Sequence, residues 1–110
     1  IQVLDSLAFV LFQDGQDFGI MKFLYNDGWE YRDSFRNFPV AVGSINCFLA
    51  NDSTLFIGTN YGIYLGNLSE NLKDPNRWQP IDDAMDFEVT SATFNDSFIA
   101  FSSKTSLYFI

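Results

Sequence analysis

The chain has 110 residues, of which 47% are hydrophobic and 18% aromatic, so we expect one small region with a packed core and not a disordered chain. The formal net charge is −8, whereas a protein that binds a phosphate backbone needs a basic surface. No nucleic acid is therefore expected as a partner. Histidine is absent, which excludes histidine-based catalysis and histidine metal sites within this chain.

No apolar run approaches the roughly 20 residues of a membrane-spanning helix, so no membrane-spanning segment is expected. The first residue is Ile1 and not Met, which indicates that a leader was removed or that the chain is a piece of a longer one. We expect no cofactor and no metal.

A polar turn followed by an apolar strand occurs three times along the chain. The turns contain Asp5-Ser6, Asp52-Ser53 and Asp96-Ser97, so successive repeats are 47 and 44 residues apart. Such a period is typical of repeats of small antiparallel sheets. The sequence therefore predicts an all-β chain of blade-like, four-stranded antiparallel sheets, in a single region 1–110 with units of about 1–40, 41–84 and 85–110.

In the first unit we expect strands at Ile1–Leu4, Leu7–Phe12, Gly19–Tyr25 and Gly28–Asp33. Asn26-Asp27-Gly28 predicts a hairpin turn between the last two. In the third unit we expect strands at Val89–Phe94, Phe98–Ser102 and Ser106–Ile110. This last unit has no fourth strand and is incomplete.

In the second unit we expect strands at Ile45–Ala50, Thr54–Thr59, Gly62–Gly66 and Arg77–Ile81. Leu55-Phe56-Ile57 is a continuous apolar run, which predicts a strand that is buried on both faces. The long polar connection at 67–76 has room for one helical turn at 69–73, which Pro75 would end.

The sequence LFIGTNYGIY, Leu55 to Tyr64, resembles the core motif of β-propeller blades in two-component-regulator propellers and related secreted bacterial repeat proteins. The sequence NRWQPI, Asn76 to Ile81, is similar to the tryptophan-bearing outer strand of such blades. The likeness covers roughly 45–81 and is weaker in the other two units, and the WD40 signature is not present. It implies about two and a half β-propeller blades and little about function, because propellers host enzymes, lectins, sensors and scaffolds.

Propellers close with about four to eight blades, which exceeds the content of this chain. We therefore expect that the rest of a longer chain, or additional copies, close the propeller. A β-sandwich or a short open stack of sheets is the alternative.

Acidic side chains are densest between the second and third units, at Asp82, Asp83, Asp86 and Glu88. A solvated loop is the favoured interpretation, and the alternative is a glycoside-hydrolysing pair in which Asp83 or Asp86 is the acid/base residue. The turn from Asp14 to Asp17 favours a hairpin over a calcium site. Cys47, the single cysteine, is predicted to be a small buried hydrophobic residue. No catalytic residue and no metal ligand is assigned.

The candidate binding residues are aromatic: Trp29, Tyr61, Tyr64 and Trp78. Exposed aromatic side chains dominate binding surfaces, and these four could form a stacking platform for sugars or for a partner chain. The alternative is that aromatic residues at matching repeat positions pack between sheets. Asn51, Asn67 and Asn95 fit the N-glycosylation sequon and are interpreted first as turn residues.

The sequence favours a non-enzymatic β-propeller-type binding or scaffold module that recognises a protein or glycan partner. One alternative is a fragment of a carbohydrate-active propeller enzyme that uses acidic residues, and another is a structural repeat of a surface protein. Whether the chain is an enzyme stays open, with the balance towards no. An extracellular or periplasmic location is expected from the resemblance alone.

Overall fold

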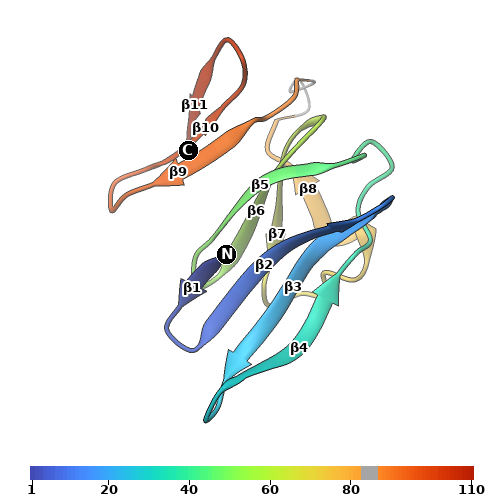
Figure 1. Cartoon of the computed structure of the whole chain (residues 1–110). Helices are drawn as coiled ribbons and strands as arrows, with labels where there is room; N and C mark the ends of the chain where they lie inside the picture. Colours follow the sequence, from blue (N-terminus) through green and yellow to red (C-terminus); the bar gives the residue numbers. More distant parts are fainter. Residues whose placement is uncertain (83–86) are drawn as a thin grey trace.

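A computed structural model describes residues 1–82 and 87–110, which form three antiparallel sheets from three consecutive stretches of chain (Figure 1). Strands that are neighbours in a sheet are also neighbours in the chain. Sheet A comprises β1 (Gln2–Leu4), β2 (Leu7–Asp14), β3 (Asp17–Tyr25) and β4 (Trp29–Phe35). Sheet B comprises β5 (Ile45–Ala50), β6 (Thr54–Thr59), β7 (Gly62–Asn67) and β8 (Trp78–Pro80). Sheet C comprises β9 (Ser91–Phe94), β10 (Ile99–Ser102) and β11 (Leu107–Phe109).

The all-β prediction is confirmed, and the strands lie close to their predicted places. Strands β5 and β6 begin and end at the predicted residues. Strands β2 and β3 are longer than predicted, because their pairing continues out to Asp14 and Asp17 at the hairpin end. The hairpin between β3 and β4 turns at Asp27 and Gly28, which both have positive φ as such a tight turn requires.

The connection at 67–76 had room for a helical turn at 69–73, but these residues form no helix. A 3₁₀ turn, η1 (Pro75–Arg77), instead begins at this proline. Proline suits the first position of a helical turn, because its missing N–H would have no partner there. The side chain of Asp74 caps the turn by accepting a hydrogen bond of 3.0 Å from the backbone N–H of Asn76.

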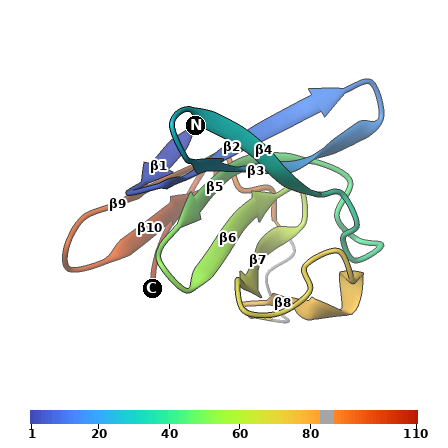
Figure 2. The same ribbon diagram turned by 90° about the horizontal axis from the view of Figure 1, so that it is seen from below.

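Sheet B lies between the other two sheets, and it packs on sheet A through one face (Figures 1 and 2). Phe9 and Ile20 of sheet A share a buried core with Leu55, Ile57 and Tyr64 of sheet B. Full burial of an aliphatic or phenyl side chain contributes roughly 1.5–3 kcal/mol, so this core is a major source of stability.

A pair of hydrogen bonds reinforces the junction of sheets A and B at its edge. The side chain of Gln2 donates to the carbonyl of Ala50 at 2.6 Å, and the N–H of Ala50 donates to the side-chain oxygen of Gln2 at 2.7 Å. The first strand of sheet A is therefore joined directly to the first strand of sheet B.

The opposite face of sheet B packs on sheet C. Phe56 and Ile63 share a second core with Val89 and Phe101, and the rings of Phe56 and Phe101 lie 6.4 Å apart between centroids. Because Leu55 and Ile57 face sheet A while Phe56 faces sheet C, β6 is buried on both faces. The prediction made from the Leu55-Phe56-Ile57 run is confirmed.

Gly58 marks the closest approach of sheet B to the chain that leads into sheet C. A Cβ atom at this position would lie 2.5 Å from Sγ of Cys47 and 2.6 Å from Cγ1 of Val89. Both distances are shorter than any real carbon contact, so the packing here has no space for a methyl group.

We predict that Gly58→Ala destabilises the chain by about 1–3 kcal/mol, the usual cost of overpacking a filled core. The midpoint of urea unfolding, followed by circular dichroism, measures this loss. Ser97→Ala, at an exposed turn residue, is the control and leaves the midpoint within error. Equal midpoints for Gly58→Ala and the wild type would contradict the close packing of sheet B on this segment.

Candidate functional site

The largest of the described hollows is a cleft where sheets A and B meet, between the loop that joins β4 to β5 and the segment η1–β8. Its volume is about 560 Å³, within the range of small-ligand sites. Nine residues line it: Phe38, Pro39, Val40, Tyr64, Pro75, Asn76, Trp78, Gln79 and Pro80. Rings and prolines make up most of the wall, and two side-chain amides supply its hydrogen-bonding groups.

Trp78 forms the floor of this junction and is held from several sides. It is only 2% exposed, and its indole N–H donates a hydrogen bond of 3.1 Å to the carbonyl of Leu72. Its cross-strand neighbour is Gly66, where a Cβ would lie 3.0 Å from the indole ring. A glycine is therefore required beneath the ring for the indole to lie flat on sheet B.

Aromatic contacts link Trp78 to sheet A. The ring of Phe38, from the β4–β5 loop, lies 5.2 Å from the indole, and on its other side it stacks on Phe18 of β3 at 5.7 Å. Such pairs stabilise by about 0.5–1.5 kcal/mol beyond their burial. The three rings fix the loop that forms one wall of the cleft.

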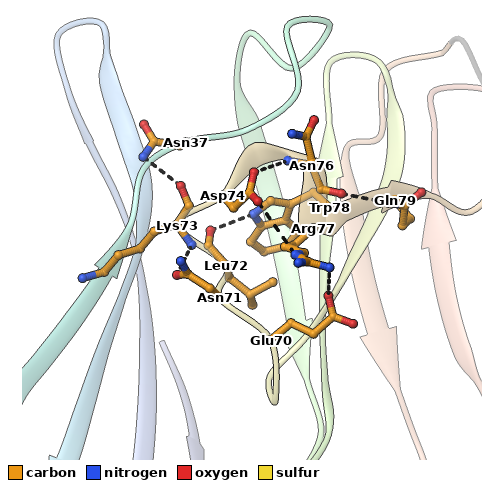
Figure 3. A network of polar contacts seen from close by, with 10 residues as sticks. All are labelled: Asn37, Glu70, Asn71, Leu72, Lys73, Asp74, Asn76, Arg77, Trp78 and Gln79. Carbon is orange, nitrogen blue, oxygen red and sulfur yellow. Dashed lines mark hydrogen bonds and ion pairs between the residues drawn. The ribbon is translucent and has the colours of Figure 1, made fainter.

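A network of polar contacts fixes the connection between β7 and β8, which forms the other wall (Figure 3). The side-chain amide of Asn37 donates to the carbonyl of Lys73 at 3.0 Å, so the connection is tied to the β4–β5 loop. Arg77 lies within ion-pair distance of Glu70 at 3.5 Å and of Asp74 at 3.8 Å. The ion-paired side chains are exposed or half-exposed, and such ion pairs add little stability. We therefore assign them the role of holding the connection between β7 and β8 in its conformation.

The ammonium group of Lys73 also reaches across to sheet A, where its Nζ lies 2.9 Å from a carboxylate oxygen of Asp33. The hydrogen bond from Lys73 lowers the pKa of Asp33, and the same bond raises the pKa of Lys73. Because the pKa of Asp33 is lower in the folded chain than in the unfolded chain, this ion pair contributes to stability at a pH above the ordinary aspartate pKa. That contribution is lost as the pH falls from there through the lowered pKa of the folded chain.

Tyr64 lines the cleft but is mostly buried, with 6% of its surface exposed. Burial raises the pKa of its phenol, so the hydroxyl is neutral at physiological pH. Among the described residues that line the cleft, none is charged under these conditions, which suits an uncharged ligand surface.

The four aromatic residues predicted to bind a partner do not form one platform. Tyr64 and Trp78 come together at the cleft, but both belong to the core between sheets A and B. Packing between sheets, the alternative from the sequence, is therefore what the structure shows for these two. A partner would reach their faces only where they border the cleft.

Tyr61 and Trp29 lie elsewhere, and each is 47% exposed. Tyr61 is in the turn between β6 and β7, where its N–H donates to the hydroxyl of Thr59 at 2.9 Å. Trp29 begins β4 and packs edge-on against Tyr25 at 5.3 Å, on the face of sheet A that points away from sheet B. Sequence spacing alone could not separate these exposed rings from the buried pair.

The three sequon asparagines are exposed, and each lies directly before a turn whose backbone its side chain bonds; Asn67 is also the last residue of β7. The side-chain oxygen of Asn51 accepts from the N–H groups of Ser53 and Thr54, and that of Asn95 accepts from Ser97 and Phe98. Asn67 accepts from the N–H of Ser69 at 2.9 Å. The turn interpretation is thus supported by direct contacts, and glycosylation stays a prediction.

The acidic groups give no assembled site among residues 1–82 and 87–110, where no cluster able to hold a metal ion is found. Asp83 and Asp86, the candidate acid/base residues, lie outside the described residues. Asp17 of the acidic turn pairs with Arg36 at 2.5 Å, which leaves its carboxylate engaged with a cation. Within the described ranges, no helix is long and apolar enough to cross a membrane.

Comparison with protein-family models, with curated proteins and with solved structures finds no match to this chain. The interpretation of its function therefore rests on the residues and geometry given above.

We predict that Trp78→Phe destabilises the chain by about 1–3 kcal/mol, because it leaves the buried carbonyl of Leu72 without its donor. Trp29→Phe is a matched control, because Trp29 is half exposed and its replacement by Phe removes little buried contact. We expect this control to cost less than about 0.5 kcal/mol. Chemical unfolding monitored by circular dichroism measures both. Equal losses would contradict the anchoring role of Trp78.

We predict that Cys47 is unreactive in the folded chain. Burial raises the pKa of its thiol from 9.0 to about 11. The side chain is partly buried against the second core, at a position where the sequence predicted a buried residue. Only the thiolate reacts, so a shift of about two units lowers the reaction rate with a disulfide reagent roughly 100-fold at pH 7. The rate in the urea-unfolded chain is the reference, and equal rates in the two states would show that the thiol is not buried as described.

Proposed function

We propose that the chain is a non-enzymatic binding module of β-propeller type, which recognises a protein or glycan partner at the cleft between the β4–β5 loop and η1–β8. The observation that carries this proposal is the lining of the cleft, in which aromatic and proline rings surround the amides of Asn76 and Gln79. Apolar walls with a few placed hydrogen-bonding groups are the usual composition of ligand sites. Sugars and proline-containing peptides both have an apolar face that can stack on the rings of the cleft. Both also have oxygen atoms that can accept hydrogen bonds from the amides of Asn76 and Gln79.

The propeller type of the proposal is supported by the form of the three sheets. Each is a meander in chain order, and sheet B is covered by a sheet on either side. Within the described residues each sheet is open, and the three sheets do not form a closed ring. An extracellular or periplasmic location belongs to the same proposal and rests on the family resemblance alone.

The cleft is suited to binding because its walls are fixed before a partner arrives. Stacked rings hold the β4–β5 loop, and hydrogen bonds hold the connection from β7 to β8. A preorganised site loses less conformational entropy on binding than a mobile one. Val40 and Gln79 are exposed at its rim, so both could contact a partner without loss of core packing. The side-chain amide of Gln79 donates a hydrogen bond of 3.0 Å to the carbonyl of Asn76, which leaves its side-chain oxygen to accept from a partner.

The test is a screen of the intact chain against two probe sets, an array of oligosaccharides and a phage library of random dodecapeptides. We predict that one set yields binders, and that Val40→Lys and Gln79→Ala each weaken their affinity about tenfold or more, as measured by calorimetry. Gln16→Ala is the matched control, since this glutamine is exposed in the β2–β3 turn away from the cleft residues.

Two results would overturn the proposal. One is the absence of binders in both sets. The other is a binder whose affinity is unchanged by both cleft variants, because recognition would then take place on another surface.

A further inference from the structure

A second hollow lies where sheets B and C meet, at the end of the stack that carries the β1–β2, β5–β6 and β9–β10 turns (Figure 1). Its volume is about 380 Å³, and we call it the turn-end hollow. Leu4, Leu49, Phe94 and Ile99 supply large apolar side chains to its lining, and Asp52 supplies a carboxylate. The turn-end hollow shares no lining residue with the cleft of the proposed function, so the two sites are independent.

The junction of sheets A and B shows how the corresponding space is closed elsewhere in the chain. Gln2 corresponds to Leu49, because each is the third residue before the aspartate of its repeat turn. Ala50 and Phe94 correspond in the same way, as the second residue before that aspartate. Gln2 and Ala50 join sheets A and B through two hydrogen bonds. Leu49 has no hydrogen-bonding side chain, and a hollow lies between it and Phe94. The hollow therefore follows from residue differences at an internal junction.

The backbone of Phe94 offers hydrogen-bonding groups to this hollow. Its cross-strand neighbour Ile99 exchanges two hydrogen bonds, of 3.3 and 2.9 Å, with Ile110 on the other side. Phe94 and Ile99 are thus a non-hydrogen-bonded antiparallel pair, and the N–H and carbonyl of Phe94 face the free edge of β9. At the equivalent edge of sheet B, the side chain of Gln2 binds the same two groups of Ala50. The structure itself therefore shows which kind of group fits this position: an amide.

The charge around the hollow is negative. Asp5, Asp52 and Asp96 lie in the three turns at this end of the stack, and all three are exposed. The ion pairs found among the described residues involve none of them, and these turns contain no lysine or arginine. Such a surface attracts a cationic partner and repels phosphate groups and anionic lipid.

We propose that the turn-end hollow docks an extended peptide segment of another protein, in which an apolar side chain stands between lysine or arginine residues. The apolar side chain enters the hollow beside the ring of Phe94, which is 53% exposed. A peptide group of the segment binds the edge of Phe94 as the amide of Gln2 binds Ala50, which is recognition by strand addition. The cationic residues lie near the carboxylates of the turns.

The size of the hollow agrees with such a partner. Ligand sites have volumes of about 300–1,000 Å³, so a hollow of about 380 Å³ is near the lower limit. It suits a single side chain with its peptide group and is too small for a larger ligand.

The test is an array of synthetic nonapeptides whose central residue is leucine, phenylalanine or serine and whose flanking residues are lysines, glutamates or serines. The intact chain is made in bacteria, so that Asn51 and Asn95 beside the hollow carry no glycan. We expect binding only where the centre is apolar and the flanks are lysines. Fluorescence anisotropy measures the affinity of the strongest binder, which is expected to fall as the salt concentration rises.

Two pairs of variants locate the binding surface. Phe94→Ser is expected to weaken the affinity at least tenfold, while its control Phe109→Ser, at a ring that is 62% exposed on β11, leaves it unchanged. Asp52→Asn is expected to weaken it about threefold. Its control Asp14→Asn changes the net charge equally, at the other end of β2, and leaves the affinity unchanged. Gln79→Ala in the cleft also leaves it unchanged.

The proposal would be overturned if no peptide of the array binds, or if glutamate-flanked peptides bind as tightly as lysine-flanked ones. Equal losses in Asp52→Asn and Asp14→Asn would also overturn it, because the attraction would then come from net charge alone. A loss in Gln79→Ala but not in Asp52→Asn would assign the peptide to the cleft instead. Circular dichroism verifies folding, and the exposed Asp52→Asn change keeps the test decisive should Phe94→Ser unfold.

Discussion

The alternation of side chains along β6 is the constraint on which the rest of the structure depends. Leu55 and Ile57 point into the core with sheet A, and Phe56 points into the core with sheet C. Successive side chains of a strand lie on opposite faces, so a shift of pairing by one residue would exchange these two sets. Gly58 and Cys47 would move with them, and the space that Gly58 leaves for Val89 would be lost. The pairing of β6 with β5 and β7 therefore decides which side chains enter each of the two cores between the sheets.

The cleft exists because of the same stacking. Trp78 begins the edge strand of sheet B, where it lies in the core that sheet A covers. The β4–β5 loop crosses from one sheet to the other at this edge, and Phe38 is the point at which it contacts the indole. The cleft walls are thus a consequence of how two sheets join, which gives a rigid site without any helix to support it.

The sequence predicted the parts of the fold that depend on local alternation and turn chemistry, and it could not predict exposure within sheet B. The limits of β5 and β6 followed from apolar runs bounded by polar turns. Trp78 and Tyr64 were expected to contact a partner, yet a strand position predicts only which face a side chain occupies. Because both faces of sheet B are covered, neither face left these rings exposed. The cleft itself depends on contacts between residues about 40 positions apart, such as Phe38 and Trp78, and no spacing in the sequence indicates it.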